Sequence, residues 1–145
     1  MSTARHVATI DLLCARSFPT ELAASEVGKS GPGYHLAELA SGESFWEDDG
    51  TCRAQDAEQY EAECAALASV LAARWGEPQL VSLWSTRVRA GEGEEISEPW
   101  RELSYGVGHA HLWRTEGRWV AVGVSHQGEE HPFQLLAAVT EIDPP

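Results

Sequence analysis

The chain has 145 residues and a formal net charge of −13, because 23 acidic residues stand against 10 lysines and arginines. A surface this negative repels nucleic acid and anionic membranes, and it attracts basic proteins. A hydrophobic fraction of 43% argues against disorder, and no apolar run reaches the roughly 20 residues that cross a bilayer. We therefore expect one domain over residues 1–145, located in the cytoplasm, that binds neither nucleic acid nor membrane directly.

The first 55 residues give weaker local signals than the rest of the chain. Residues 7–15 fit either a helix or a strand, and residues 19–22 resemble the start of a short helix. Residues 36–47 fit a hairpin that turns at Ser41 and Gly42. We expect a mixture of a short helix and a hairpin in this part of the domain.

The clearest predicted element is a helix over residues 56–75. Tyr60, Cys64, Leu67 and Leu71 recur at spacings of four, three and four, which places them on one helical face. Acidic residues gather in the first half, where the helix dipole favours negative charge. A glycine and a proline follow and end the helix.

Beyond this helix the hydrophobic period changes to two, which is typical of strands. We expect strands over residues 79–89, 107–114, 118–126 and 133–142. The last segment also allows a helix, because its leucines and alanines follow no clear period. The predicted fold is α+β, a single domain in which an antiparallel sheet packs against one long amphipathic helix over residues 56–75.

A hairpin is predicted around Glu116 and Gly117, which form its two-residue turn. This turn sets the register of the two strands that it joins. It places His111 opposite Val122 and His109 opposite Val124. The glycine at the second turn position favours this length, and a three-residue turn would shift the register.

Three histidines form the most specific candidate site. His109 and His111 lie two residues apart, so both imidazoles belong to one face of their strand, and His126 falls on the same face. Three neutral imidazoles can hold Zn²⁺ and leave its fourth position open for water, with a carboxylate such as Glu102 as base. Valines on that face fit a plain core face equally well. The alternative function is therefore a metal-dependent hydrolase or a small-molecule-binding domain that uses these histidines.

Motifs for a nucleophile or a phosphate loop are absent from the sequence. Residues 123–127 lack the last glycine of Gly-x-Ser-x-Gly, and residues 106–108 lack the third glycine of a dinucleotide-binding loop. The three cysteines are widely spaced, which favours reduced thiols over a zinc ribbon. Glu38, Glu98 and Glu102 would suit a glycosidase only if they converged across a cleft. We expect no enzymatic activity and no cofactor.

Two tryptophans lie beside acidic residues, and we expect the other four, Trp84 among them, to close the core. Tryptophan is common at binding hot spots, and carboxylates around it steer a basic partner toward the surface. The predicted partner-binding residues are Trp46, Glu47, Asp48, Asp49, Glu94, Glu95, Glu98, Trp100 and Glu102.

The preferred function is therefore a non-enzymatic, acidic protein-binding module that binds a basic protein and neutralises or chaperones it. A long helix on an antiparallel sheet with an acidic surface is shared by several unrelated small bacterial binders, among them secretion chaperones and toxin-neutralising immunity proteins. Mimicry of nucleic acid ranks lower, because the carboxylates are spread over the helix start, two loops and both ends of the chain.

Overall fold

The computed structural model describes residues 3–25, 28–41, 51–126 and 133–144. These residues form one seven-stranded antiparallel sheet, in the order β1-β2-β3-β7-β6-β5-β4, and four helices. The elements are α1 (Thr3–Ala15), β1 (Ala23–Ser25), β2 (Gly28–Gly31), β3 (Tyr34–Ser41), α2 (Thr51–Trp75), β4 (Gln79–Ser82), α3 (Trp84–Gly91), α4 (Trp100–Gly106), β5 (His109–Thr115), β6 (Arg118–Ser125) and β7 (Gln134–Thr140).

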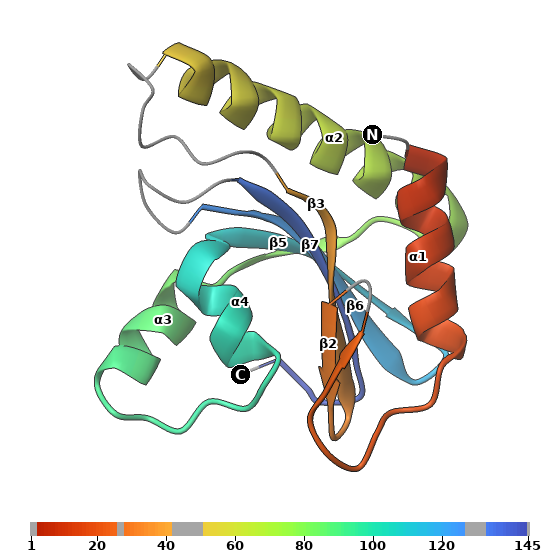
Figure 1. The fold of residues 1–145 in the computed structure, drawn as a ribbon, viewed down its shortest axis with the longest axis vertical. Coiled ribbons are helices and arrows are strands. Elements are labelled where there is room, and N and C mark those ends of the chain that lie inside the picture. Colours follow the sequence, from red (N-terminus) through yellow and green to blue (C-terminus); the bar gives the residue numbers. More distant parts are fainter. Residues whose placement is uncertain (1–2, 26–27, 42–50, 127–132, 145) are drawn as a thin grey trace.

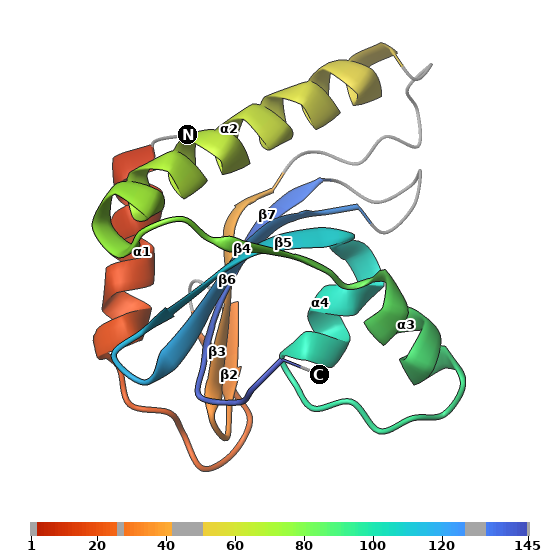
Figure 2. The same cartoon turned by 180° about the vertical axis from the view of Figure 1, so that it is seen from behind.

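The helices cover both faces of the sheet and make three layers. Helices α1 and α2 lie on one face, and α3 and α4 lie against the other (Figure 1). The view from behind shows α2 running across the strands and α3 beyond the edge strand β4 (Figure 2). Strand β7 sits between β3 and β6, so the last strand joins the two halves of the sheet.

Each face of the sheet has its own hydrophobic core. Beneath α1 and α2, the predicted helical face of Tyr60, Cys64, Leu67 and Leu71 is buried, with Leu67 0% exposed. Alternation along β7 sends one set of side chains to this core and the other set to the core under α4. A sheet buried on both faces has near-continuous apolar strands, which is why β7 lacks a clear period of two.

The predicted α+β fold with an antiparallel sheet is confirmed, but four helices pack on this sheet where one long amphipathic helix was predicted. Residues 79–89 form strand only as far as Ser82, and α3 follows. The side chains of Leu83 and Thr86 are buried at helical spacing and Ala90 is partly buried. Because Thr86 is polar, the hydrophobic residues of this segment show no helical period. The alternation of its valines and leucines instead predicts a strand.

The N-terminal expectations have mixed outcomes. Residues 7–15 belong to a helix, α1, and residues 19–22 form bends instead of the predicted helix start. A hairpin does occur here, but it joins β2 to β3. Residues 42–47 of the predicted hairpin lie outside the described residues.

The predicted hairpin between β5 and β6 is confirmed. Glu116 and Gly117 have φ values of 50° and 80°, as a two-residue turn with two left-handed positions requires. His111 pairs with Val122 as predicted. The predicted pairing of His109 with Val124 is wrong. The regular pairing of β5 with β6 ends at the pair of His111 and Val122, and the register then shifts, so that Val107 forms a bridge with Ser125. His109 pairs on its other side with Ser82 of β4.

Candidate functional site

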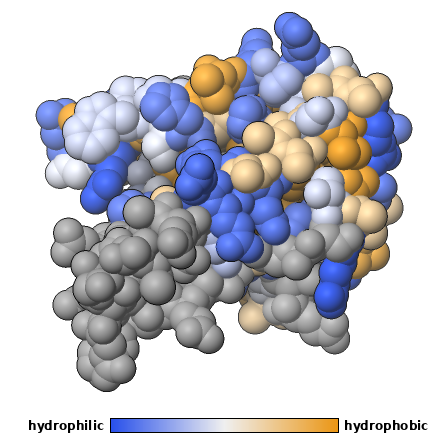
Figure 3. Space-filling view, turned by 90° about the horizontal axis from the view of Figure 1, so that it is seen from above, coloured by the Kyte–Doolittle hydropathy of each residue, from blue (hydrophilic) through white to orange (hydrophobic). Residues whose placement is uncertain are grey.

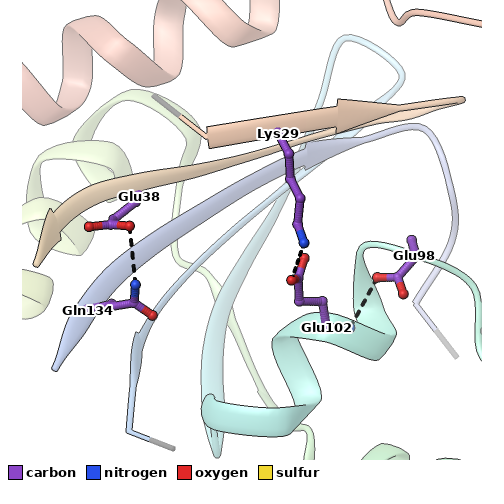
Figure 4. A network of polar contacts seen from close by, with 5 residues as sticks. All are labelled: Lys29, Glu38, Glu98, Glu102 and Gln134. Carbon is purple, nitrogen blue, oxygen red and sulfur yellow. Dashed lines mark hydrogen bonds and ion pairs between the residues drawn. The ribbon is translucent and has the colours of Figure 1, made fainter. Parts of the chain in front are cut away.

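A groove lies between strand β2 and helix α4 on the face of the sheet opposite α2. It consists of two cavities, of about 270 and 590 Å³, which share Lys29 and Glu102 in their walls. These two side chains form an ion pair across the groove (Figure 4). The first cavity also contains Glu38 and the second contains Glu98, so we call the pair of cavities the acidic groove.

Local hydrogen bonds orient the other carboxylates of the acidic groove. The Glu98 carboxylate accepts a hydrogen bond of 3.2 Å from the backbone N–H of Glu102, at the start of α4. The Glu38 carboxylate accepts one of 3.2 Å from the side-chain amide of Gln134 on β7 (Figure 4). The two cavities thus contain two carboxylates from the start of α4 and its preceding loop and one from β3.

Tyrosines and one arginine complete the acidic groove. Burial raises the pKa of Tyr34, and the negative charge of Glu98 adds to this shift, so the phenol stays a hydrogen-bond donor. The guanidinium of Arg101 donates to the hydroxyl of Tyr105 at 3.1 Å. Both groups line the second cavity with Leu22, which is exposed. The groove therefore combines negative charge with apolar and aromatic walls.

Of the predicted partner-binding residues that the structure describes, only two line the acidic groove. The structure brings Glu98 and Glu102 together in the acidic groove. Glu94 lies elsewhere, where it pairs with Arg89 at 2.7 Å beside the end of α3, and Glu95 is exposed in the same loop. The first group of predicted residues, Trp46, Glu47, Asp48 and Asp49, lies outside the described residues.

Trp100 corrects the sequence interpretation most directly. It was expected at the surface, but its side chain is 0% exposed and packs in the core under α4. Its indole N–H donates to the carbonyl of Ile142 at 2.9 Å, which satisfies the polar end of the buried ring. Trp84 has the opposite outcome, because it was expected in the core and is 65% exposed at the start of α3.

A second, larger cavity of about 940 Å³ lies where α2 leaves the outer part of the sheet uncovered. His109, His111 and His126 all line it, together with Arg87 and Trp84 of α3. We call it the histidine cavity. His126 stacks on Phe133 with ring centroids 4.8 Å apart, and His111 stacks on Trp113 at 6.2 Å.

The histidine cavity has no metal-binding geometry within the part of the chain that the structure describes. No group of three His, Cys, Asp or Glu side chains is placed there to hold a metal ion. Cys64 also lines the cavity, and burial, with a smaller effect of Glu61, raises the pKa of its thiol to about 11. The thiol is therefore protonated at neutral pH, which removes Cys64 as a thiolate nucleophile.

Sequence reasoning missed Lys29, Arg87 and Trp84. Lys29 is the single lysine of the chain. The sequence does not show that it lies beside α4, because the pairing of β2 with β3 places it there. Arg87 and Trp84 belong to a segment predicted as a strand, where they would lie on opposite faces, whereas α3 places them on one side, where both line the histidine cavity.

Wider comparisons give no further assignment. In the described ranges no helix has the length and apolar character needed to cross a membrane. The chain matches no protein-family model, no curated protein and no solved structure.

Proposed function

We propose that this protein is a non-enzymatic binding module that binds a basic protein partner and neutralises or chaperones it. The observation that carries the proposal is the acidic groove, in which Glu102 already holds an ammonium group, that of Lys29. A lysine or arginine of a partner presents the same chemistry to Glu38, Glu98 and Glu102. Lys29 thus occupies the position that we assign to the partner's cation.

The charge distribution supports this proposal beyond the groove itself. Arg74, Arg89 and Arg114 pair with carboxylates of the chain, as Lys29 does. Acidic residues outnumber lysines and arginines by 13, so a large excess of carboxylates remains after these pairs are formed. An excess of this size raises the local concentration of basic proteins and speeds their association at low ionic strength.

Apolar contacts of the partner have a place in the same groove. Leu22 and Tyr105 line the second cavity and are exposed, so they can pack against the aliphatic stem of a lysine or arginine. On the side of the molecule seen in Figure 3, hydrophilic residues are mixed with small groups of hydrophobic ones. In the groove itself, exposed apolar side chains beside carboxylates favour docking by charge together with local apolar contacts.

The test is an affinity capture from the source cell at low salt, followed by kinetics with the captured protein. We expect a partner with a basic isoelectric point, and an association rate that falls steeply as salt rises. The double variant Glu98→Gln/Glu102→Gln should slow association and speed dissociation. The matched control is Glu58→Gln/Glu77→Gln, which removes the same charge from exposed positions outside the groove.

Two results would overturn the proposal. One is capture of acidic or neutral proteins only, or binding that is indifferent to ionic strength. The other is equal weakening by both double variants, because the groove would then contribute no more than general charge.

A further inference from the structure

We propose that the histidine cavity is a second and separate site, which binds a small organic anion, a molecule with a carboxylate or phosphate group on an apolar or aromatic body. The inference does not depend on the acidic groove or on a protein partner. It rests on the chemistry of the groups that line the cavity.

Hydrogen-bond donors and a cation meet in this cavity in an otherwise acidic protein. Arg87 reaches it from α3, and His109 and His111 reach it from β5. Arg87 makes no ion pair with any carboxylate that the structure describes, whereas Arg89 of the same helix is paired with Glu94. A planar guanidinium without a carboxylate partner among the described residues suits a carboxylate or phosphate group of a ligand, which it binds through two parallel hydrogen bonds.

One negative group opposes this preference. Glu61 of α2 is the carboxylate found among the described lining residues. Its negative charge lowers the affinity of the cavity for an anion. The same charge provides a test, because a substitution that removes it should raise this affinity. Neutralising Glu61 should strengthen anion binding, an effect that a misfolded variant could not produce.

The sheet itself explains why the cavity is open. Leu80, His111 and Val122 lie side by side across β4, β5 and β6. Val122 is 0% exposed under α2, His111 is half-buried, and Leu80 is 65% exposed at the edge. The helical layer therefore ends above β5, and the outer part of the sheet becomes the floor of the cavity.

Apolar walls supply contacts for the body of the ligand. Trp84 and Leu80 are both 65% exposed and stand at the rim. Phe133 and Val124 line the same space, and the protonated Cys64 thiol adds a small apolar wall. Ligand sites commonly combine such walls with a few converging polar groups, and the volume of about 940 Å³ falls within their usual range.

The first experiment is calorimetric titration of the full chain with phenyl phosphate, benzoate, inorganic phosphate and benzylamine. We expect saturable binding of phenyl phosphate or benzoate, and the stronger of the two identifies the anionic group. Inorganic phosphate should bind more weakly because it lacks the apolar body. Benzylamine has that body with the opposite charge and should not bind. Equal binding of benzylamine, or no binding of either aromatic anion, would overturn the proposal.

The second experiment assigns the binding to the cavity. Arg87→Gln should weaken it by about ten- to a hundredfold, the change expected for loss of a charge-assisted hydrogen bond. Arg5→Gln removes the same charge from an exposed position on α1 and should leave it unchanged. Glu61→Gln should tighten binding. Because Trp84 lines the cavity and is exposed, we also expect the ligand to change its fluorescence, and Trp84→Phe should reduce this change. The proposal fails if Arg87→Gln and Arg5→Gln behave alike, or if Glu61→Gln weakens binding.

Discussion

Lys29 on β2 and Glu102 on α4 form an ion pair between residues that lie 73 positions apart in the chain. Both side chains are partly exposed, at 49% and 32%. An ion pair of this kind contributes little to stability, because water screens it. Its position inside an acidic groove matters more, since it keeps one carboxylate of the groove occupied by a cation of the same chain.

Removing that cation should improve binding of a basic ligand. Lys29→Gln frees Glu102, so we expect tighter binding of a short oligolysine peptide at low salt and a change in the free energy of unfolding of less than about 1 kcal/mol. Lys29→Arg keeps the charge and should behave like the wild type. Weaker binding by Lys29→Gln would show that Lys29 supports the site instead of competing for it.

Leu67 lies on the buried face of α2 that the helical spacing predicts. Its side chain is 0% exposed between the helix and the sheet, so Leu67→Asp should destabilise the domain by about 3–5 kcal/mol through an unpaired buried charge. Val70 belongs to the same helix, three residues further on, and is 41% exposed. Val70→Asp should have little effect in the same thermal denaturation experiment, and equal losses would contradict the packing described for α2.

Trp100 is expected to act on stability and not on partner binding. Trp100→Ala removes a fully buried ring and should cost about 3–5 kcal/mol. Trp100→Phe keeps much of the volume and loses the hydrogen bond to Ile142, so a smaller loss is expected. Binding by folded Trp100→Phe should equal that of the wild type. A selective loss of binding would restore Trp100 as a contact residue.

His35 should make stability depend on pH. Burial lowers the pKa of this imidazole, which lies against Phe18 and contacts Ser30 Oγ at 2.6 Å. Below the unfolded-state pKa of about 6.5, the unfolded chain binds a proton that the folded chain resists. Stability is therefore present above that pH and is lost as the pH falls.

The measurement for His35 is urea denaturation at pH 7.5 and 5.5. The wild type should lose stability between these two values. His35→Gln should be less stable at pH 7.5 but show a smaller pH-dependent loss. An unchanged loss in the variant would assign the effect to other groups.

The sequence by itself determined the local elements with strong signals. The α2 face of Tyr60, Cys64, Leu67 and Leu71 follows from helical spacing. The turn at Glu116 and Gly117 follows from the backbone freedom that a two-residue hairpin needs. Both features depend on interactions between residues that are close in the sequence, so the sequence is sufficient to predict them.

Only the tertiary structure decided which distant residues share a site. Trp100 became a core residue because α4 turns it toward Ile142, and Trp84 became exposed because residues after Ser82 form a helix. Glu38 and Glu98 line neighbouring cavities that share Glu102, because the sheet brings β2 and β3 beside α4. The spacing of these residues in the sequence does not show which of them share a site. Long-range packing sets both the register of the sheet and the face that each helix covers.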